Sequence, residues 1–211
     1  IPLDNSLGSY YALFTNYLGF DVAEDEYKVM GMAAYGKKNY NIEKVLSLKN
    51  NDYFKLNNSF LNRSKSSPTG NNQGSFYSNK LVKLLGNPRK REEKFNQRHF
   101  DIAKSVQEHL ENACIRVIKK AIKLTNERNI CLSGGVALNC KANGILKKLP
   151  EVNNLFVQPA ASDRGLSLGC AAYTHVKYSK TKLSPLKNLY LGPRYSKKII
   201  EENLKLCGLK Y

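Results

Sequence analysis

The segment that most constrains the fold of this chain spans residues 129–173 and reads NICLSGGVALNCKANGILKKLPEVNNLFVQPAASDRGLSLGCAAY. Within it, two short apolar runs, at 130–132 and 155–157, each lead into a polar loop and then into a helical pattern. The order strand, loop, helix therefore occurs twice, which predicts an α/β fold. Ligands of such folds bind outside the carboxyl ends of the strands, so the loops at 133–135 and 161–165 are the candidate sites.

The longest remaining pattern is a helix from about Phe100 to Thr125, which keeps one apolar stripe along its length. His109 lies within it and is expected to be a partly exposed helix histidine rather than a ligand. The run GMAAYG at 31–36 predicts a close approach of the backbone to another element or to a ligand. The other expected elements are helices over 7–18, 41–48 and 196–207 and strands over 52–61 and 189–191.

Two segments read as loops. Residues 62–79 are rich in Ser, Asn and Gly, which is typical of a surface loop or a lid. Residues 86–98 carry five basic and two acidic side chains and are expected to form a solvated loop that leads into the long helix.

The charge balance argues against nucleic acid as a partner. Thirty-four Lys and Arg against 17 Asp and Glu give a net charge of +17, but the charges are spread out and few aromatic residues lie between them. No apolar run approaches the roughly 18 residues that a membrane span needs, so no membrane partner is expected. The five cysteines form no C-x-x-C pair and lie mostly in apolar patterns, as buried thiols do, which favours the cytoplasm.

The first candidate loop has the chemistry of an anion site. Ser133, Gly134 and Gly135 join a strand to a helix, so that backbone N–H groups can face an anion without interference from a Cβ atom. The spacing matches neither the P-loop nor the Rossmann motif, and a tight turn for helix-on-sheet packing remains the alternative. Asn139, one helical turn further on, is expected either to reach a nucleotide or to face solvent.

Asp163 dominates the second candidate loop, because it is the only acid between Glu151 and Glu201. Two interpretations stay open: the aspartate caps the following helix, or it supplies a hard oxygen ligand to a metal or a metal-bound phosphate. The three histidines are isolated in sequence, so they predict no metal cluster.

Several blocks in order resemble one family. The central segment is similar to the O-carbamoyltransferases of nodulation-factor and antibiotic biosynthesis and, more distantly, to the tRNA threonylcarbamoyl transferases. The other blocks that carry the resemblance are SLGSYYALFTNYLGF, DEYKVMGMAAYG, DIAKSVQEHLENA and LYLGPRYS.

The resemblance implies the second half of an actin/Hsp70-like ATPase fold, built from ribonuclease-H-like units. Residues 1–180 would be the C-terminal part of the carbamoyltransferase domain, and 181–211 a linker and the beginning of a nucleotide-handling domain. The implied reaction moves a carbamoyl group from carbamoyl phosphate, through carbamoyl adenylate made with ATP, to the hydroxyl of a small-molecule acceptor.

The resemblance also assigns residues to this site. Ser133, Gly134, Gly135 and Asn139 would bind the nucleotide, and Asp163 would bind a divalent metal, iron or similar. The same cleft would be lined by Gly8, the neighbourhood of Tyr11 and Ala12, Lys28 and Gly31.

One departure is large, because the family's remaining metal ligands, two histidines spaced H-x-x-x-H, have no counterpart here. The first half of the fold is therefore expected upstream of Ile1 and most of the C-terminal domain beyond Tyr211, so this chain alone is expected to be inactive. The alternative is a nucleotide-binding regulatory or scaffold module without transfer chemistry, and a small-molecule kinase on the same fold is a third possibility.

Overall fold

The computed structural model of this protein describes residues 5–49, 53–62, 75–185, 188, 190 and 192–210. It divides into two compact units, Ile1–Leu166 and Ser167–Tyr211. Helices and strands are mixed, which agrees with the predicted α/β class. In the described part of the chain, no helix combines the length and apolar character needed to cross a membrane.

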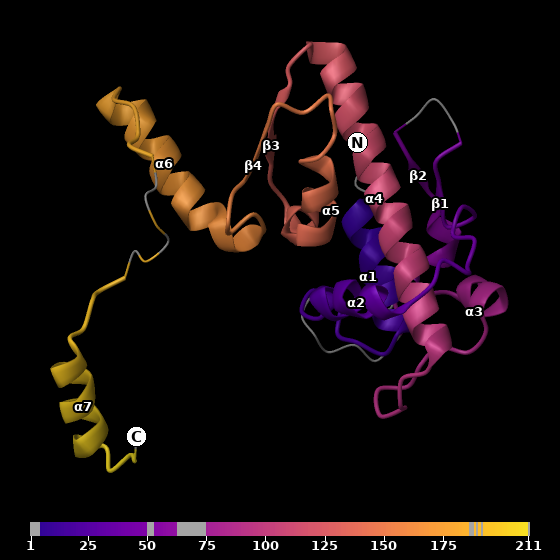
Figure 1. Ribbon diagram of the computed structural model, residues 1–211, viewed down its shortest axis with the longest axis horizontal. Helices are drawn as coiled ribbons and strands as arrows, with labels where there is room; N and C mark the ends of the chain where they lie inside the picture. The colour runs from indigo at the N-terminus through magenta and orange to yellow at the C-terminus, as the bar shows by residue number, and fades with distance from the viewer. Residues whose placement is uncertain are drawn as a thin grey trace. The chain divides into compact units, whose positions relative to one another are not determined.

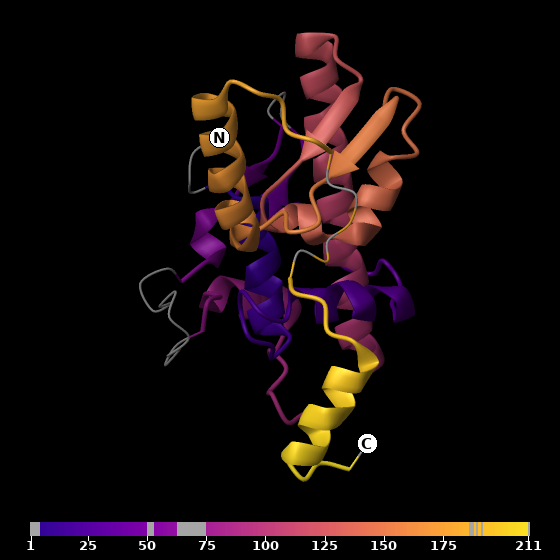
Figure 2. The same cartoon turned by 90° about the vertical axis from the view of Figure 1, so that its left-hand side faces the viewer.

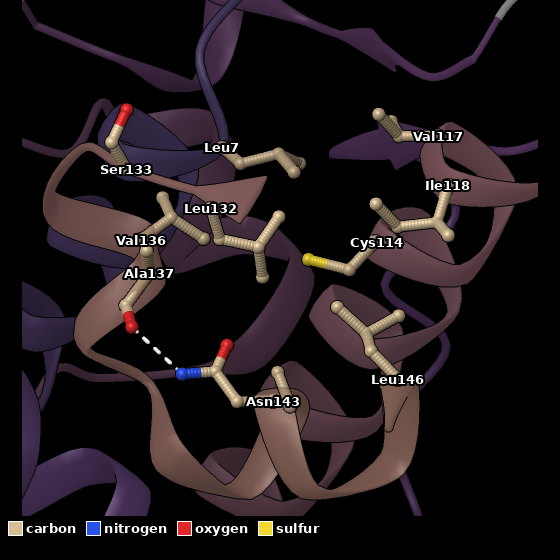
Figure 3. A pocket seen from close by; sticks show the side chains of 11 residues that line it. Leu7, Cys114, Val117, Ile118, Leu132, Ser133, Val136, Ala137, Asn143 and Leu146 are labelled. Carbon is tan, nitrogen blue, oxygen red and sulfur yellow. Dashed lines mark hydrogen bonds between the residues drawn. The ribbon is translucent and has the colours of Figure 1, made fainter. Parts of the chain in front are cut away.

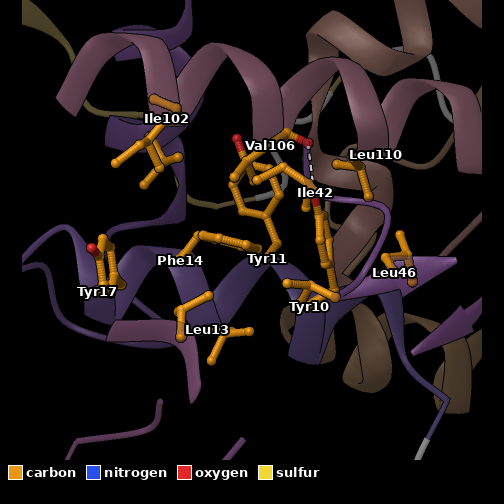
Figure 4. Close-up of a cluster of buried hydrophobic side chains, with 14 of the residues drawn as sticks. Tyr10, Tyr11, Leu13, Phe14, Tyr17, Ile42, Leu46, Ile102, Val106 and Leu110 are labelled. Carbon is orange, nitrogen blue, oxygen red and sulfur yellow. Dashed lines mark hydrogen bonds between the residues drawn. The ribbon is translucent and has the colours of Figure 1, made fainter. Parts of the chain in front are cut away.

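The core of the first unit lies between helices α1 (Leu7–Tyr17) and α4 (Gln97–Thr125). Side chains from the two helices interdigitate in Figure 4, where the Tyr10 hydroxyl donates to the backbone oxygen of Val106 at 3.1 Å. The Ser6 side chain caps α1 by accepting from the Ser9 amide. The predicted first helix is confirmed.

Helix α4 confirms the predicted long helix but begins earlier than Phe100. Asn96 caps it by accepting from the His99 amide, and the His99 side chain accepts from the Asn96 amide in return. This reciprocal pair satisfies two backbone donors at the helix start. At the other end, Asn126 takes the left-handed conformation (φ 58°) that terminates helices.

The GMAAYG run forms the end of helix α2 (Glu26–Met32) and the 3₁₀ turn η1 (Ala33–Tyr35). Gly36 follows, and a Cβ atom there would lie 2.0 Å from the carbonyl oxygen of Phe100 on α4. The predicted close backbone approach is therefore confirmed at Gly36, against another element of the fold.

The helix expected over 41–48 is wrong. This segment is a turn followed by strand β1 (Leu46–Ser47), which pairs antiparallel with β2 (Lys55–Leu56). The Glu43 carboxylate accepts from the Ser47 hydroxyl and the Leu48 amide, so it stabilises the turn instead of a helix. The strand expected over 52–61 shrinks to β2, followed by the turn η2 (Asn58–Phe60) and, later, helix α3 (Asn79–Leu85).

Two polar side chains are more buried than expected. His109 is buried against the β1 segment, where its Nε2 atom contacts the backbone oxygen of Leu46. Arg89 lies in the predicted solvated loop, yet it is 8% exposed and donates to the backbone oxygens of Leu18, Arg91 and Glu93. Its guanidinium lies 4.1 Å from the centre of the Phe95 ring. Both groups are covered by elements distant in sequence, which local pattern does not reveal.

Strands β3 (Asn129–Leu132) and β4 (Asn154–Val157) confirm the two predicted strands and pair in parallel, with Cys131 opposite Phe156. Helix α5 (Cys140–Leu146) connects them (Figure 1). Figure 2 shows the two arrows side by side along α4. Alternate strand residues, together with Leu146 of α5, pack on Ile118 of α4 in a second hydrophobic cluster, so one face of this small sheet is anchored.

The second unit contains most of α6 (Leu166–Ser179) and all of α7 (Lys197–Leu206), neither of which has a buried residue. Ser196 caps α7 by accepting from the Ile199 amide, and the helix expected over 196–207 is confirmed. The strand expected over 189–191 and most of the loop or lid at 62–79 lie outside the described residues.

The expectation of mostly buried thiols is wrong. Four cysteines are exposed and Cys114 is half-buried. Along β3 the side chains alternate between faces, so that Ile130 and Leu132 pack inward while Cys131 turns outward. The apolar run therefore did not imply burial of every residue in it.

Candidate functional site

The first candidate loop leaves strand β3 at Ser133 and turns at Gly134, whose φ of 94° is rarely adopted by residues with a side chain. The 3₁₀ turn η4 (Gly135–Leu138) follows at once. As the first two residues of this turn, Gly135 and Val136 have N–H groups without an acceptor inside the turn. Apart from the adjoining residues, no atom of the described chain would lie within 4 Å of a Cβ atom added at Gly134 or at Gly135, so the space beside these two glycines is open.

The two candidate loops are joined directly. The Gly134 amide donates to the backbone oxygen of Ala161 at 2.6 Å. Its N–H is therefore used within the fold, whereas the N–H groups of Gly135 and Val136 are the ones left to face an anion. On the second loop, Gly165 lies so close to the Ala160 carbonyl oxygen that an added Cβ would be 2.2 Å from it, which keeps that loop compact.

Asp163 is the first residue of the 3₁₀ turn η5 (Asp163–Gly165), and the N-cap position belongs to Ser162. The interpretation of Asp163 as a capping residue is thus wrong. Its side chain is exposed and has no hydrogen bond or ion pair with any described residue. Such a carboxylate fits the role of one metal ligand. Within the described ranges no three His, Cys, Asp or Glu side chains are grouped to hold a metal ion, so Asp163 is not part of a complete metal centre among these residues.

Asn139 does not lie inside a helix, as the sequence suggested, but at the junction of η4 and α5, where it is the N-cap residue. It is buried, so it does not face solvent. Its Oδ1 atom accepts from the Ala142 amide at 2.9 Å and from Gln107 Nε2 at 3.0 Å, and its Nδ2 atom donates to Gln107 Oε1 at 2.9 Å. Most of its hydrogen-bonding capacity is therefore used inside the fold.

Gln107 extends this contact into a buried network. The Tyr11 hydroxyl donates to Gln107 Oε1 at 2.7 Å, and Gln107 Nε2 also donates to Glu111 Oε1 at 3.0 Å. Burial raises the pKa of Tyr11 far above its ordinary value, and the nearby Glu111 carboxylate raises it further, against the opposing effect of Asn139. Tyr11 is therefore a neutral donor, and the network links helices α1, α4 and α5.

The other predicted site residues divide into two groups. Gly8 on α1 faces the first loop, since a Cβ there would lie 3.9 Å from Val136 Cγ2. Lys28 pairs with Asp25 at 2.8 Å and lies over the Phe20 ring, and none of its described contacts reaches the loop. Gly31 has open space around it. The structure thus gathers the loop residues and Gly8 together, but it does not join Lys28 or Gly31 to them.

A cavity of about 110 Å³ lies beneath the first loop (Figure 3). Its walls are almost entirely apolar; the Ser133 hydroxyl and the Asn143 amide are the main polar groups, and the amide donates to the Ala137 oxygen at 2.7 Å. Burial, and secondarily the Glu111 carboxylate, raise the pKa of the Cys114 thiol to about 11, so this thiol is neutral. An uncharged apolar cavity does not suit a phosphate, so the open amides of Gly135 and Val136 are the better candidate for an anion site.

Comparison with known proteins identifies the family of this chain. A sequence model described as the carbamoyltransferase N-terminus matches residues 1–172. The chain belongs to the carbamoyltransferase family. The resemblance predicted from the sequence blocks is therefore confirmed.

Relatives of this carbamoyltransferase chain are longer than it is. It is 36% identical to an uncharacterized protein of Synechocystis, over 97% of this chain and 34% of that protein. It is 34% identical to the nodulation protein NolO of Bradyrhizobium diazoefficiens (91% and 32%) and 32% identical to the nodulation protein NolNO of Sinorhizobium fredii (98% and 28%). The chain thus spans about a third of the length of these relatives.

Sequence reasoning about this carbamoyltransferase chain missed three residues that shape the loop. Val136 carries an open amide, Gln107 on α4 holds Asn139, and Glu111 in turn holds Gln107. The available signal was the pair of polar residues four apart in the apolar stripe of the long helix, a spacing that puts both on one face.

Proposed function

We propose that this chain forms one side of the active-site cleft of an ATP-dependent O-carbamoyltransferase with an actin/Hsp70-like fold. In this proposal ATP, carbamoyl phosphate and water yield carbamoyl adenylate, pyrophosphate and phosphate, and the carbamoyl group then passes to a hydroxyl of a small-molecule acceptor. Residues 1–180 contribute the second half of the cleft, and 181–211 lead into a nucleotide-handling domain. The cytoplasmic location predicted from the sequence belongs to the same proposal.

The observation that carries the proposal is the loop at the end of β3. Two successive amides, those of Gly135 and Val136, lack acceptors within their turn, and the space beside Gly134 and Gly135 is open. Backbone donors at the start of a helical turn bind phosphate oxygens well. The loop with Asp163 is tied to this one by the bond from Gly134 to Ala161, so a phosphate-binding loop and an exposed carboxylate belong to one constellation at the strand ends.

In the transfer step the acceptor hydroxyl oxygen attacks the carbonyl carbon of carbamoyl adenylate. A carbon–oxygen bond to the acceptor forms, the carbon–oxygen bond to AMP breaks, and the products are the carbamate ester, AMP and the hydroxyl proton. The amides of Gly135 and Val136 would hold the phosphate of the adenylate and stabilise the charge that gathers on it. Asp163 would hold a divalent metal together with histidines outside this chain; when bound, that metal supplies Lewis-acid polarisation.

The test removes one amide from the loop of the full-length protein. Gly135→Pro deletes the N–H group at the first position of η4, where proline is tolerated, and the ψ of 164° at Gly134 suits a residue before proline. ATP binding by calorimetry and carbamoyl-phosphate-dependent AMP release should both fall by about tenfold or more. Gly144→Ala, in open space on α5, is the matched control and should change neither.

Three outcomes count against the proposal. A Gly135→Pro protein that binds ATP normally would remove the loop from the site. A wild-type protein that binds ATP but forms no AMP with carbamoyl phosphate would favour the regulatory or scaffold alternative. Unchanged metal content in Asp163→Ala would exclude that carboxylate as a ligand.

A further inference from the structure

The strongest feature that the proposed function leaves unused is the reciprocal amide pair between Gln107 and Asn139. Each side chain donates to the other, at 3.0 and 2.9 Å, across 32 residues of sequence. Gln107 is 1% exposed and Asn139 9%. Water therefore cannot readily replace either hydrogen bond, and the pair fixes the orientation of both amides.

The surroundings leave Gln107 little freedom to turn. Its Oε1 atom accepts from both Tyr11 and Asn139, and its Nε2 atom donates to both Glu111 and Asn139. Rotation of the amide by half a turn would place donor against donor and acceptor against acceptor. Only a side chain with one acceptor and one two-hydrogen donor can make all four of these hydrogen bonds, so this position specifies glutamine chemically.

Asn139 transmits this constraint to the loop. Its backbone amide donates to Val136 and closes η4, and its side chain caps α5. The loop is thus anchored at its start by the bond between Gly134 and Ala161 and at its end by Gln107. Between these two anchors lie the open amides.

We infer that Gln107 is a positioning residue for the carbamoyltransferase site: through Asn139 it sets the pose of the Ser133–Leu138 loop and aims its open amides at the phosphate. This inference rests on the proposed function for the identity of the ligand. Gln107 itself lies buried on α4 and does not touch the ligand, so its effect is on preorganisation of the loop. Preorganised donors bind a charged group without a reorganisation cost at the moment of binding.

Two variants of the full-length protein break the pair from opposite sides. Gln107→Met keeps the approximate shape of the side chain and removes all four hydrogen bonds. Asn139→Ser removes both bonds to Gln107 but retains a good N-cap for α5. This variant therefore still tests the inference if Gln107→Met does not fold. Ser105→Ala is the matched control, because Ser105 is 1% exposed on the same helix and bonds to Tyr40 and Asp101, which are not part of the loop.

The first readout needs no ligand. Hydrogen exchange of the peptide spanning 134–142 reports on the bonds that Ala137 and Asn139 donate to the loop and on the bond that Ala142 donates to the Asn139 side chain. It should speed up in Gln107→Met and in Asn139→Ser, and stay as in wild type in Ser105→Ala. An exchange rate in Gln107→Met equal to that of the control would overturn the inference.

The second readout is the affinity for ATP measured by calorimetry. Each single variant should bind about tenfold more weakly, a factor that corresponds to about 1.4 kcal/mol. The double variant should bind no more weakly than Asn139→Ser alone, because Gln107 acts through Asn139; full additivity of the two losses would overturn the inference. If the wild-type protein binds no ATP, the proposed function fails, and the exchange measurement alone decides the role of Gln107.

Discussion

Gly36 offers a direct test of how the chain is packed, because the Gly36→Ala change has a calculable steric consequence. The added Cβ atom would lie 2.0 Å from the carbonyl oxygen of Phe100, 2.4 Å from its carbon and 2.9 Å from the Asp101 nitrogen. All three are backbone atoms of α4 and cannot rotate away. The segment at Gly36 must therefore move from α4 by about 1 Å before the closest contact becomes tolerable.

The displacement would also strain a charged hydrogen bond. The residue after Gly36 is Lys37, whose amide donates to Asp101 Oδ1 at 2.8 Å. Overpacking costs about 1–3 kcal/mol, and a hydrogen bond to a charged group contributes about 1.5–3 kcal/mol. We expect Gly36→Ala to lower the free energy of unfolding by about 3–5 kcal/mol, a large share of the roughly 5–15 kcal/mol typical of domains.

The same substitution five residues earlier is the control. Gly31 lies in α2, and a Cβ atom added there would have no other atom within 4 Å. Gly31→Ala should therefore raise the free energy of unfolding by up to about 1 kcal/mol through helix propensity. Urea unfolding followed by circular dichroism measures both, provided that the slope with urea stays constant. A Gly36→Ala protein within about 0.5 kcal/mol of wild type would refute the packing described for this segment.

Three further changes test other parts of the fold. Burial lowers the pKa of His99, although Glu93 opposes the shift; the unfolded chain then binds more protons, so the unfolding free energy should fall as the pH drops below about 6.5. His99→Gln, which can keep the capping box, should flatten that dependence. An unchanged pH profile in this variant would show that His99 is not its source. Arg89→Lys loses the three-way fork to backbone oxygens and should cost about 2 kcal/mol in urea unfolding; no loss would mean that the guanidinium geometry is unimportant. Gly134→Ala should cost about 1–3 kcal/mol because φ is 94°, and a neutral result in the same assay would contradict the loop geometry.

The local sequence pattern was sufficient to predict a helix or strand where a residue's neighbours in sequence are also its neighbours in space. The stripe of α4 and the apolar cores of β3 and β4 follow from helical and strand periodicity alone. The segment 41–48 shows the limit, because Ile42, Val45 and Leu46 are spaced as in a helix. All three are buried, but in a turn and strand, since Leu46 pairs with Leu56. That pairing joins residues 10 positions apart, and no helical or strand period encodes it.

The candidate site likewise has parts that the sequence predicted and parts that it did not. Both loops were predicted, because each is a short polar segment between a strand and a helical pattern. The bond between Gly134 and Ala161, and the pair between Gln107 and Asn139, join residues 27 and 32 apart. Such bonds depend on the parallel pairing of the strands and on how α4 packs against α5, so they became visible only in the folded chain.

The two glycines of the first loop illustrate why a motif needs its structure. Gly134 is required by the chain itself, because its φ of 94° turns its N–H toward Ala161. Gly135 does not have a positive φ, and a methyl group there would meet no atom of the described chain. The fold thus accounts for the first glycine and not for the second. A ligand that approaches the Gly135 amide closely would account for the second, since a Cβ atom would stand in its way. The sequence presented these glycines as one anion-binding unit, whereas in the structure the first joins the two loops and only the second remains open to the proposed ligand.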